Sequence, residues 1–250
     1  MKNSFARIAA LTKRNLKEIL RDPIGLVFMI ALPLVMEVTF YLIFHGMTSQ
    51  FDMKYLAPGI VVFSQAFLTL FTGLLIALDR STSFLTRLYV TGTKSYQFIF
   101  GYTFSVLPIC LVQAVLFFAV GAVIDPSIIS VALIPAILLS VVTSLLFIGF
   151  GILFGSLCNE KAIGGVSSIV ITGQSVLSAM WFPTEGMSGV MMTIMSVLPF
   201  KNATDLIQNI IIGVNDAFND VILPLIIVLA YTVAVLVAAI LVFGKKMKDN

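Results

Sequence analysis

Few side chains in this sequence are of the types that carry out catalysis, and they are far apart. The single histidine, His45, and the two cysteines, Cys110 and Cys158, have none of the spacings by which proteins hold a metal ion. The sequence also has no G-x-x-x-x-G-K-[ST] loop that could bind a nucleotide phosphate. We therefore expect this chain to be neither an enzyme nor a cofactor-binding protein.

One acidic residue, Glu37, lies well inside an apolar run of the sequence. An ionised carboxylate at the centre of a bilayer costs about 2.5 to 3.5 kcal/mol, so this side chain should face the protein interior and be protonated or paired. It could contact a cationic group of a substrate or make a gating hydrogen bond. A structural hydrogen bond to a neighbouring helix is the alternative.

Other polar and aromatic side chains in apolar runs could line the same path. For the glutamines the alternative is a structural hydrogen bond between helices. For the aromatic residues it is anchoring at the membrane interface. These candidates are Gln65, Gln113, Gln174, Trp181 and Phe182.

Residues 79–97, DRSTSFLTRLYVTGTKSYQ, form the longest polar interval in the first two-thirds of the chain. The interval carries three cations, Arg80, Arg87 and Lys94. Its apolar residues recur at helical spacing, which predicts a short amphipathic helix at a membrane surface. These apolar residues are Phe84, Leu85, Leu88 and Tyr89.

The composition indicates an all-α integral membrane protein. Of its 250 residues, 59% are hydrophobic and 11% are charged, and the mean hydropathy is +1.08, whereas about a quarter of the residues of a soluble domain are charged. Because each crossing needs about 20 apolar residues, the chain has room for a single transmembrane domain, residues 1–250, and for no soluble catalytic domain. We expect six spans: Ile24–Phe44, Ala57–Leu78, Phe98–Ile124, Ile128–Leu157, Ala162–Trp181 and Val221–Phe243.

Residues 1–22 are basic and amphipathic. At 100° per residue the apolar side chains fall on one arc and cations such as Arg14, Lys17 and Arg21 on another, as in an interfacial helix. No short apolar core with a small-residue cleavage site marks a signal peptide. Asp22 and Pro23 end the segment, because the residue before proline is disfavoured in helical geometry.

Positive charges predict the orientation. Thirteen Lys and Arg residues lie before the first span, in the 79–97 interval, at Lys161 and after the last span, against Lys54 and Lys201 on the other side. Both termini should therefore be cytoplasmic, in the plasma membrane. Anionic lipid headgroups account for the basic charge without a nucleic-acid partner. The far side is acidic, with Asp52, Asp125, Glu185, Asp205, Asp216 and Asp220.

The outer segment, residues 182–220, contains two apolar runs that are too short to cross a bilayer, Val190–Leu198 and Ala203–Ile212. We expect two short helices on or in the outer leaflet that cap a pathway. Gly151-x-x-x-Gly155 predicts close approach of another helix, either in this chain or across a dimer.

These elements together resemble the membrane subunits of ABC-2 type transporters, chiefly the small bacterial exporter permeases. The resemblance rests on the basic helix closing with Arg21-Asp22-Pro23, the polar loop after the second span, and Phe182-Pro183 opening an outer helical pair. It implies that the loop carries a coupling helix that docks on an ATPase subunit, which binds the ATP and Mg²⁺. The residues at the coupling positions are Asp79, Arg80, Phe84, Leu85, Arg87 and Leu88.

The resemblance also implies a pair of permeases, either two copies of this chain or this chain with a homologue. The function expected is outward transport of an amphiphilic substrate: a drug, an antimicrobial peptide or a lipid-like compound. An ion-coupled carrier without an ATPase is one alternative, although a single buried acid and no internal repeat argue against it. A membrane protein that protects or assembles another component is the second.

Overall fold

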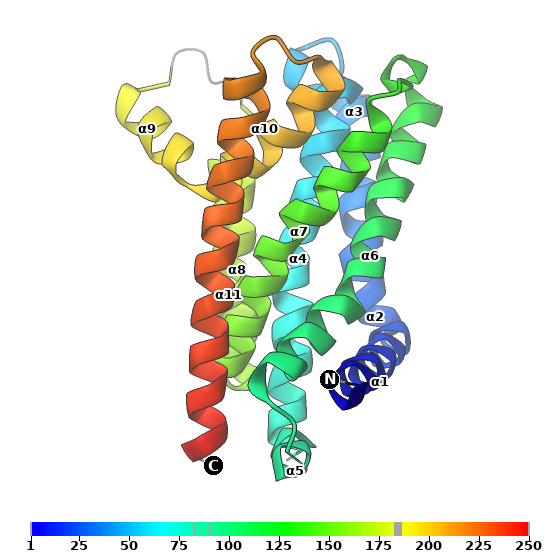
Figure 1. The fold of residues 1–250 in the computed structure, drawn as a ribbon. Coiled ribbons are helices and arrows are strands. Elements are labelled where there is room, and N and C mark those ends of the chain that lie inside the picture. Colours follow the sequence, from blue (N-terminus) through cyan, green and yellow to red (C-terminus); the bar gives the residue numbers. More distant parts are fainter. Residues whose placement is uncertain (1, 83, 91, 183–186, 250) are drawn as a thin grey trace.

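The computed structural model describes residues 2–82, 84–90, 92–182 and 187–249, and all regular structure among them is helical. Pro183 and Glu185 of the outer segment lie outside the described residues. Long helices run side by side along one axis, and short helices cover both ends of the bundle (Figure 1). The fold is therefore all-α, as predicted.

Five helical segments of the described chain are long and apolar enough to cross a membrane. The first is continuous through α2 (Pro23–Leu26), the π-helical turn η1 (Val27–Ala31) and α3 (Leu32–Phe44). The last runs through the π-helical turn η4 (Phe218–Ile222) into α11 (Leu223–Asp249). The other three are α4 (Met53–Ser81), α6 (Ser95–Ile124) and α7 (Leu133–Leu157).

The predicted span 162–181 corresponds to α8 (Glu160–Leu177), an 18-residue helix that is not among these five. Glu160, Lys161 and interspersed glycine, serine, threonine and glutamine residues lower its apolar character. The helix ends before Trp181 because Ala179 has a φ of 59°, outside right-handed helical geometry. The predicted fourth span also starts later than expected, since residues 126–128 form the separate 3₁₀ turn η3 (Pro126–Ile128).

Helices also occupy each of the short segments where the sequence predicts them. They are α1 (Lys2–Leu20), α5 (Phe84–Val90), α9 (Gly189–Val197) and α10 (Pro199–Ile212). Both termini, α1 and α5 lie at one end of the bundle, whereas α9 and α10 lie at the opposite end with the 3₁₀ turn η2 (Ser49–Phe51) (Figure 1). We call the first end, which carries Arg14, Lys17 and Arg87, the basic end, and the other the acidic end.

Prolines explain both π-helical turns. Pro33 has no N–H to donate to the carbonyl of Met29, four residues earlier, and the side-chain amide of Gln113 donates to that carbonyl instead at 2.9 Å. Pro224 likewise cannot donate to Asp220, whose carbonyl accepts from the Asn209 side chain at 3.0 Å. In both spans a neighbouring helix thus satisfies the carbonyl that proline leaves unpaired.

Helix α4 is the centre of the bundle, because α3, α6, α7, α8 and α10 all pack against it. Its closest neighbour is α7. A Cβ placed on Gly151 would lie 2.8 Å from the Thr69 carbonyl oxygen, and one on Gly155 would lie 2.7 Å from that of Gly73. The small-residue motif therefore brings two helices of the same chain together.

Candidate functional site

The carboxylate of Asp79 is the centre of a polar cluster at the basic end, near the last turn of α4. It is 2% exposed, yet it accepts two hydrogen bonds from the Arg14 guanidinium, at 2.5 and 2.6 Å. The Tyr102 hydroxyl of α6 donates a third at 2.5 Å. A buried carboxylate needs such compensation, and the two-point contact with arginine fixes orientation as well as charge.

Arg14 connects this cluster to two further groups. Its guanidinium lies 2.5 Å from Glu18, one turn along α1, and stacks over the Phe84 ring of α5 at 4.3 Å. Burial opposes the charged form of Arg14, but the hydrogen bond and charge of Asp79, together with Glu18, outweigh it and raise the pKa of Arg14. Arg14 is therefore a permanent cation that ties α1 directly to α4 and α5 and, through Asp79, to Tyr102 of α6.

Arg80, the next residue along α4, points to a different helix. Its Nη1 lies 2.8 and 2.7 Å from the carbonyl oxygens of Gly155 and Ser156, and 3.2 Å from that of Cys158. These carbonyls belong to the C-terminal turn of α7 and the residue after it, where helix carbonyls lack intrahelical partners and favour a cation. Adjacent residues of α4 thus fix α1, α5 and α6 on one side and α7 on the other.

Helix α1 lies against α6 along a continuous seam. Arg7 donates to the Gly92 carbonyl at 2.7 Å, and Ser4 hydrogen bonds to the Tyr96 hydroxyl at 3.0 Å and to the Gln97 side chain. Farther along, a Cβ on Gly101 would lie 2.8 Å from the Cβ of Leu11. The contact is therefore close enough that α1 and the first turns of α6 form one unit.

The predicted coupling residues of α5 divide between two faces. Leu85 is 1% exposed and belongs to the core at this end, Phe84 lies under Arg14, and Leu88 packs against the same core. Arg87 and Val90 lie on the exposed face, and Val90 is 81% exposed. Val90 was absent from the sequence prediction, although its spacing of three residues from Arg87 on a helix places the two close together.

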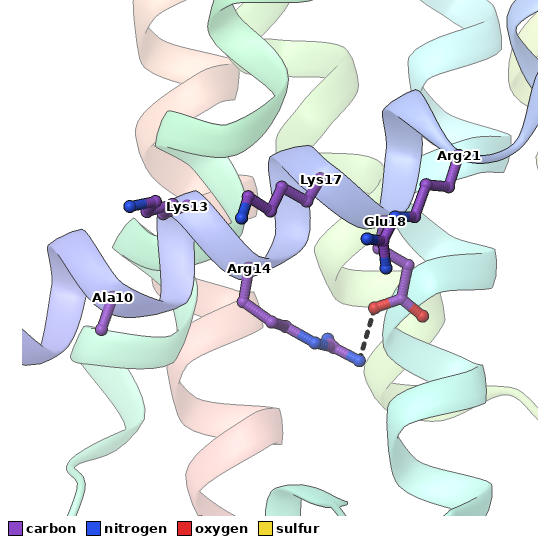
Figure 2. A pocket seen from close by; sticks show the side chains of 6 residues that line it. All are labelled: Ala10, Lys13, Arg14, Lys17, Glu18 and Arg21. Atoms are coloured by element: carbon purple, nitrogen blue, oxygen red, sulfur yellow. Dashed lines mark ion pairs between the residues drawn. The ribbon is translucent and has the colours of Figure 1, made fainter.

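The residues predicted for the interfacial helix all lie at its C-terminal half or just after it. Asp22 accepts a hydrogen bond from the Gly25 backbone at 2.9 Å and so caps α2, which begins with Pro23. Lys17 and Arg21 are exposed, and with Arg14 they line a groove of about 680 Å³ along α1 (Figure 2). The remaining lining residues are Ala10, Lys13 and Glu18.

Three candidates for a substrate path make contacts between helices. The Gln65 amide of α4 donates to the Ser140 carbonyl of α7 at 2.8 Å and accepts from the Thr143 hydroxyl at 2.8 Å. Gln174 of α8 donates to the Thr204 hydroxyl of α10 at 2.9 Å. Gln113, described above, supports the π-helical turn of the first span. These amides hold pairs of helices together at separate places in the bundle.

The other three candidates lie nearer the acidic end. Glu37 is fully buried, and neither of its carboxyl oxygens has a hydrogen-bond partner among the described residues. The Trp181 ring lies 4.8 Å from Phe40 and 6.0 Å from Phe63, edge to face, and its N–H donates to Ser175 at 3.0 Å. Phe182 is half exposed. The six path candidates do not gather around one described cavity.

The cluster at the basic end joins α1, α4, α5 and α6 through charged, hydrogen-bonded and cation–ring contacts. Within the described chain no group of three or more His, Cys, Asp or Glu side chains is placed to hold a metal ion. Tyr102 and Glu18 were missed by sequence reasoning, because a lone tyrosine in an apolar helix and one acid in a basic helix carry no distinctive pattern.

Comparison with known proteins identifies the family. The profile of the ABC-2 type transporter family matches residues 6–212, which include most of α1, the Asp79 cluster, α5 and both helices of the outer segment. No curated protein matches the chain at a significant level. Because the profile covers most of the sequence and the fold is a bundle of membrane-spanning helices, this chain belongs to the ABC-2 type transporter family and is a multi-pass membrane permease without a nucleotide-binding motif of its own.

Proposed function

We propose that this permease moves an amphiphilic compound outward across the plasma membrane, driven by ATP hydrolysis on a separate subunit that docks on α5 and α1. The observation that carries the proposal is the Asp79 cluster. Through it, the exposed face of α5 is linked by buried ionic and hydrogen-bonded contacts to α1, α4 and α6, and Arg80 extends the link to α7. A displacement of α5 would therefore move several spans together.

The proposed topology has six spans, with α8 as the fifth, and both termini in the cytoplasm. Its support is the separation of charged residues between the two ends of the bundle. Cations of α1 and α5 lie at the end with the termini, while Asp52, Asp125 and Asp216 lie at the other. Loops rich in lysine and arginine stay on the cytoplasmic side.

A second permease, either another copy or a homologue, would complete the transporter. The buried stripe of α8 faces α4, whereas Gly164, Gly165 and Ser168 lie on its exposed face. A Cβ placed on either glycine would meet nothing within 4 Å. Small and weakly polar side chains suit close packing against another helix better than contact with lipid tails.

An amphiphilic substrate, such as a drug, an antimicrobial peptide or a lipid-like compound, fits the acidic end best. The aromatic residues Phe40 and Phe63 lie on α3 and α4, and Trp181 follows the end of α8, at the level where a compound would leave for the outer leaflet. Glu37 lies one helical turn from Phe40 on the same helix and is the candidate contact for a cationic group.

The experiment that tests the proposal is capture of the ATPase. The tagged full-length chain is purified from native membranes in mild detergent beside the variant Arg87→Ala/Val90→Ala. The matched control is Lys54→Ala/Val214→Ala, which removes one exposed cation and one exposed valine at the acidic end. We expect an ABC-type ATPase with the native chain and the control, and its loss from the α5 variant.

If no ATPase accompanies the native chain, the proposal is wrong, and ion-coupled transport by the chain alone becomes the function to test. If the ATPase stays bound to the α5 variant, docking uses another surface and the assigned role of α5 is wrong. If the ATPase is captured as expected, measuring which amphiphiles stimulate its ATP hydrolysis identifies the substrate.

A further inference from the structure

Two hollows lie next to each other at the C-terminal half of α1. The first is the groove of about 680 Å³ that Lys13, Arg14, Lys17, Glu18 and Arg21 line (Figure 2). The second is a slot of about 240 Å³ between the end of α1, the start of the first span and α4. Glu18 lines both, so the two hollows meet there.

The groove has an excess of positive charge. Arg14 points toward Glu18, and Lys13, Lys17 and Arg21 follow one another at four-residue spacing along the same helix (Figure 2). The Arg14 charge is already shared between Asp79 and Glu18. Lys13, Lys17 and Arg21 are the exposed cations of the groove, and none of them forms an ion pair with an acid in the part of the chain that the structure describes. A ligand in the groove would therefore be anionic.

The slot is apolar along its depth. Its walls come from Ile19, from Leu26 and Met29 of the first span, and from one face of α4. The α4 residues are Phe71, Leu74, Leu75 and Leu78. Two carboxylates lie at its rim: Asp22, which accepts from the Gly25 backbone, and Glu18, which is paired with Arg14. Both are compensated within the chain, so the slot can accept a hydrocarbon segment.

We propose that an anionic phospholipid binds here, with its phosphate on Lys13, Lys17 and Arg21 and part of one acyl chain in the slot. A basic groove that adjoins an apolar slot is complementary to a molecule with an anionic head and an apolar tail. The exposed apolar side chains of Leu20, Ile24 and Val27 lie at the same bend, where the chain passes from α1 into the first span. The lipid would brace α1 against α4 next to the Asp79 cluster.

The test measures binding by isothermal titration of the full-length chain, purified without an ATPase. The probes are dioctanoyl phosphatidylglycerol, dioctanoyl phosphatidylcholine, and glycerol phosphate as a headgroup without tails. Lys13→Gln/Lys17→Gln is compared with Lys161→Gln/Lys245→Gln, which removes two exposed cations elsewhere in the chain. Leu74→Trp fills the slot. Each variant must elute from size exclusion as the native chain does.

We expect phosphatidylglycerol to bind best. Its affinity should fall about 30-fold in Lys13→Gln/Lys17→Gln, since each basic residue near a lipid surface contributes about a fivefold change in affinity. The control variant Lys161→Gln/Lys245→Gln should lower the affinity for phosphatidylglycerol by about twofold or less. Leu74→Trp should weaken it by about tenfold, because each buried CH₂ contributes about fourfold. Equal binding of glycerol phosphate would show a simple anion site, and equal loss in the two lysine pairs would show general surface attraction; either result overturns the proposal.

A third result would contradict the lipid site and assign the groove to the ATPase subunit instead. If Lys13→Gln/Lys17→Gln leaves lipid binding unchanged but abolishes ATPase capture, the groove belongs to the partner subunit and the lipid site is wrong. The titration contains no ATPase, so its result is independent of the proposed function. Lipid can bind even if no ATPase is captured, and an ATPase can be captured even if no lipid binds.

Discussion

Among the described residues, two carboxyl groups are buried in the spans of this permease, and their surroundings are opposite. Asp79, near the basic end of α4, is 2% exposed and accepts hydrogen bonds from Arg14 and Tyr102. Glu37, in α3, is 0% exposed and has no partner among the described residues. The two groups are therefore buried to nearly the same extent, but only Asp79 has partners that compensate its charge.

This difference distinguishes an ionised group that holds helices together from a buried group that makes no such contact. A buried carboxylate with a two-point arginine partner fixes the geometry of the helices that carry both groups. A buried carboxyl without a partner is tolerated in a membrane only in its neutral form, and it adds little to the packing of its neighbours. The Asp79 cluster should therefore determine the stability of the basic end, and Glu37 should affect function more than folding.

The largest expected effect comes from Arg14→Gln. Removing the guanidinium leaves the Asp79 carboxylate buried without its counter-ion, which costs about 3 to 5 kcal/mol. Thermal unfolding of the purified chain in detergent measures the loss. Arg14→Gln/Asp79→Asn should be more stable than Arg14→Gln alone, because it removes the unpaired charge. If the double variant is less stable than the single one, the ion pair is not the source of the effect.

Tyr102→Phe should have a smaller effect at the same cluster. It deletes the hydroxyl that donates to Asp79 at 2.5 Å and leaves the Arg14 contact in place. A hydrogen bond to a charged group is worth about 1.5 to 3 kcal/mol, and we expect the lower end because Arg14 still compensates the carboxylate. Tyr96→Phe, which removes only an exposed, neutral hydrogen bond to Ser4 from the same helix, is the control. Equal unfolding temperatures for the two variants would contradict the assignment.

Gln113→Leu tests a neutral contact in the bundle. The substitution leaves the Met29 carbonyl without a donor, since Pro33 cannot supply one. Hydrogen bonds between membrane helices contribute about 0.6 kcal/mol on average and about 1.7 at most, so the loss should be below that of either change at the Asp79 cluster. Gln113→Glu, in its neutral form, keeps a donor and should retain more stability. A loss above about 3 kcal/mol would mean that the amide does more than support the turn.

Glu37→Gln should have the smallest effect on stability, about 0.5 kcal/mol or less, because an amide replaces a neutral carboxyl of the same size and neither group has a partner. Transport or ATPase stimulation by cationic amphiphiles should fall, while the response to neutral ones persists. A large loss of stability would show that Glu37 is ionised and paired. An unchanged response to cations would remove its proposed role in substrate contact.

Periodicity and charge were sufficient to predict much of the architecture. Apolar run length predicted the five described helical segments that are long and apolar enough to cross a membrane, and the spacing of apolar residues predicted helices near 1–22, 79–97 and 182–220. The predicted fifth span, Ala162–Trp181, is not among these five, because α8 mixes apolar residues with glycine and serine and ends where Ala179 leaves helical geometry. Helix length and amphipathic pattern are local properties, and sequence carries them directly.

The partners of each polar side chain depended on tertiary structure. Sequence placed Asp79 and Arg80 at the start of a coupling loop, but 65 residues separate Arg14 from Asp79, and no local pattern joins them. The same holds for Gly151 and Gly155, whose contact with α4 instead of a second chain follows from helix packing. In a membrane, apolar surface alone does not select which helices meet, so close packing and a few buried polar contacts decide it. Sequence therefore determined which segments are helices and which end is basic, and the tertiary structure decided which charge is compensated and which is left unpaired.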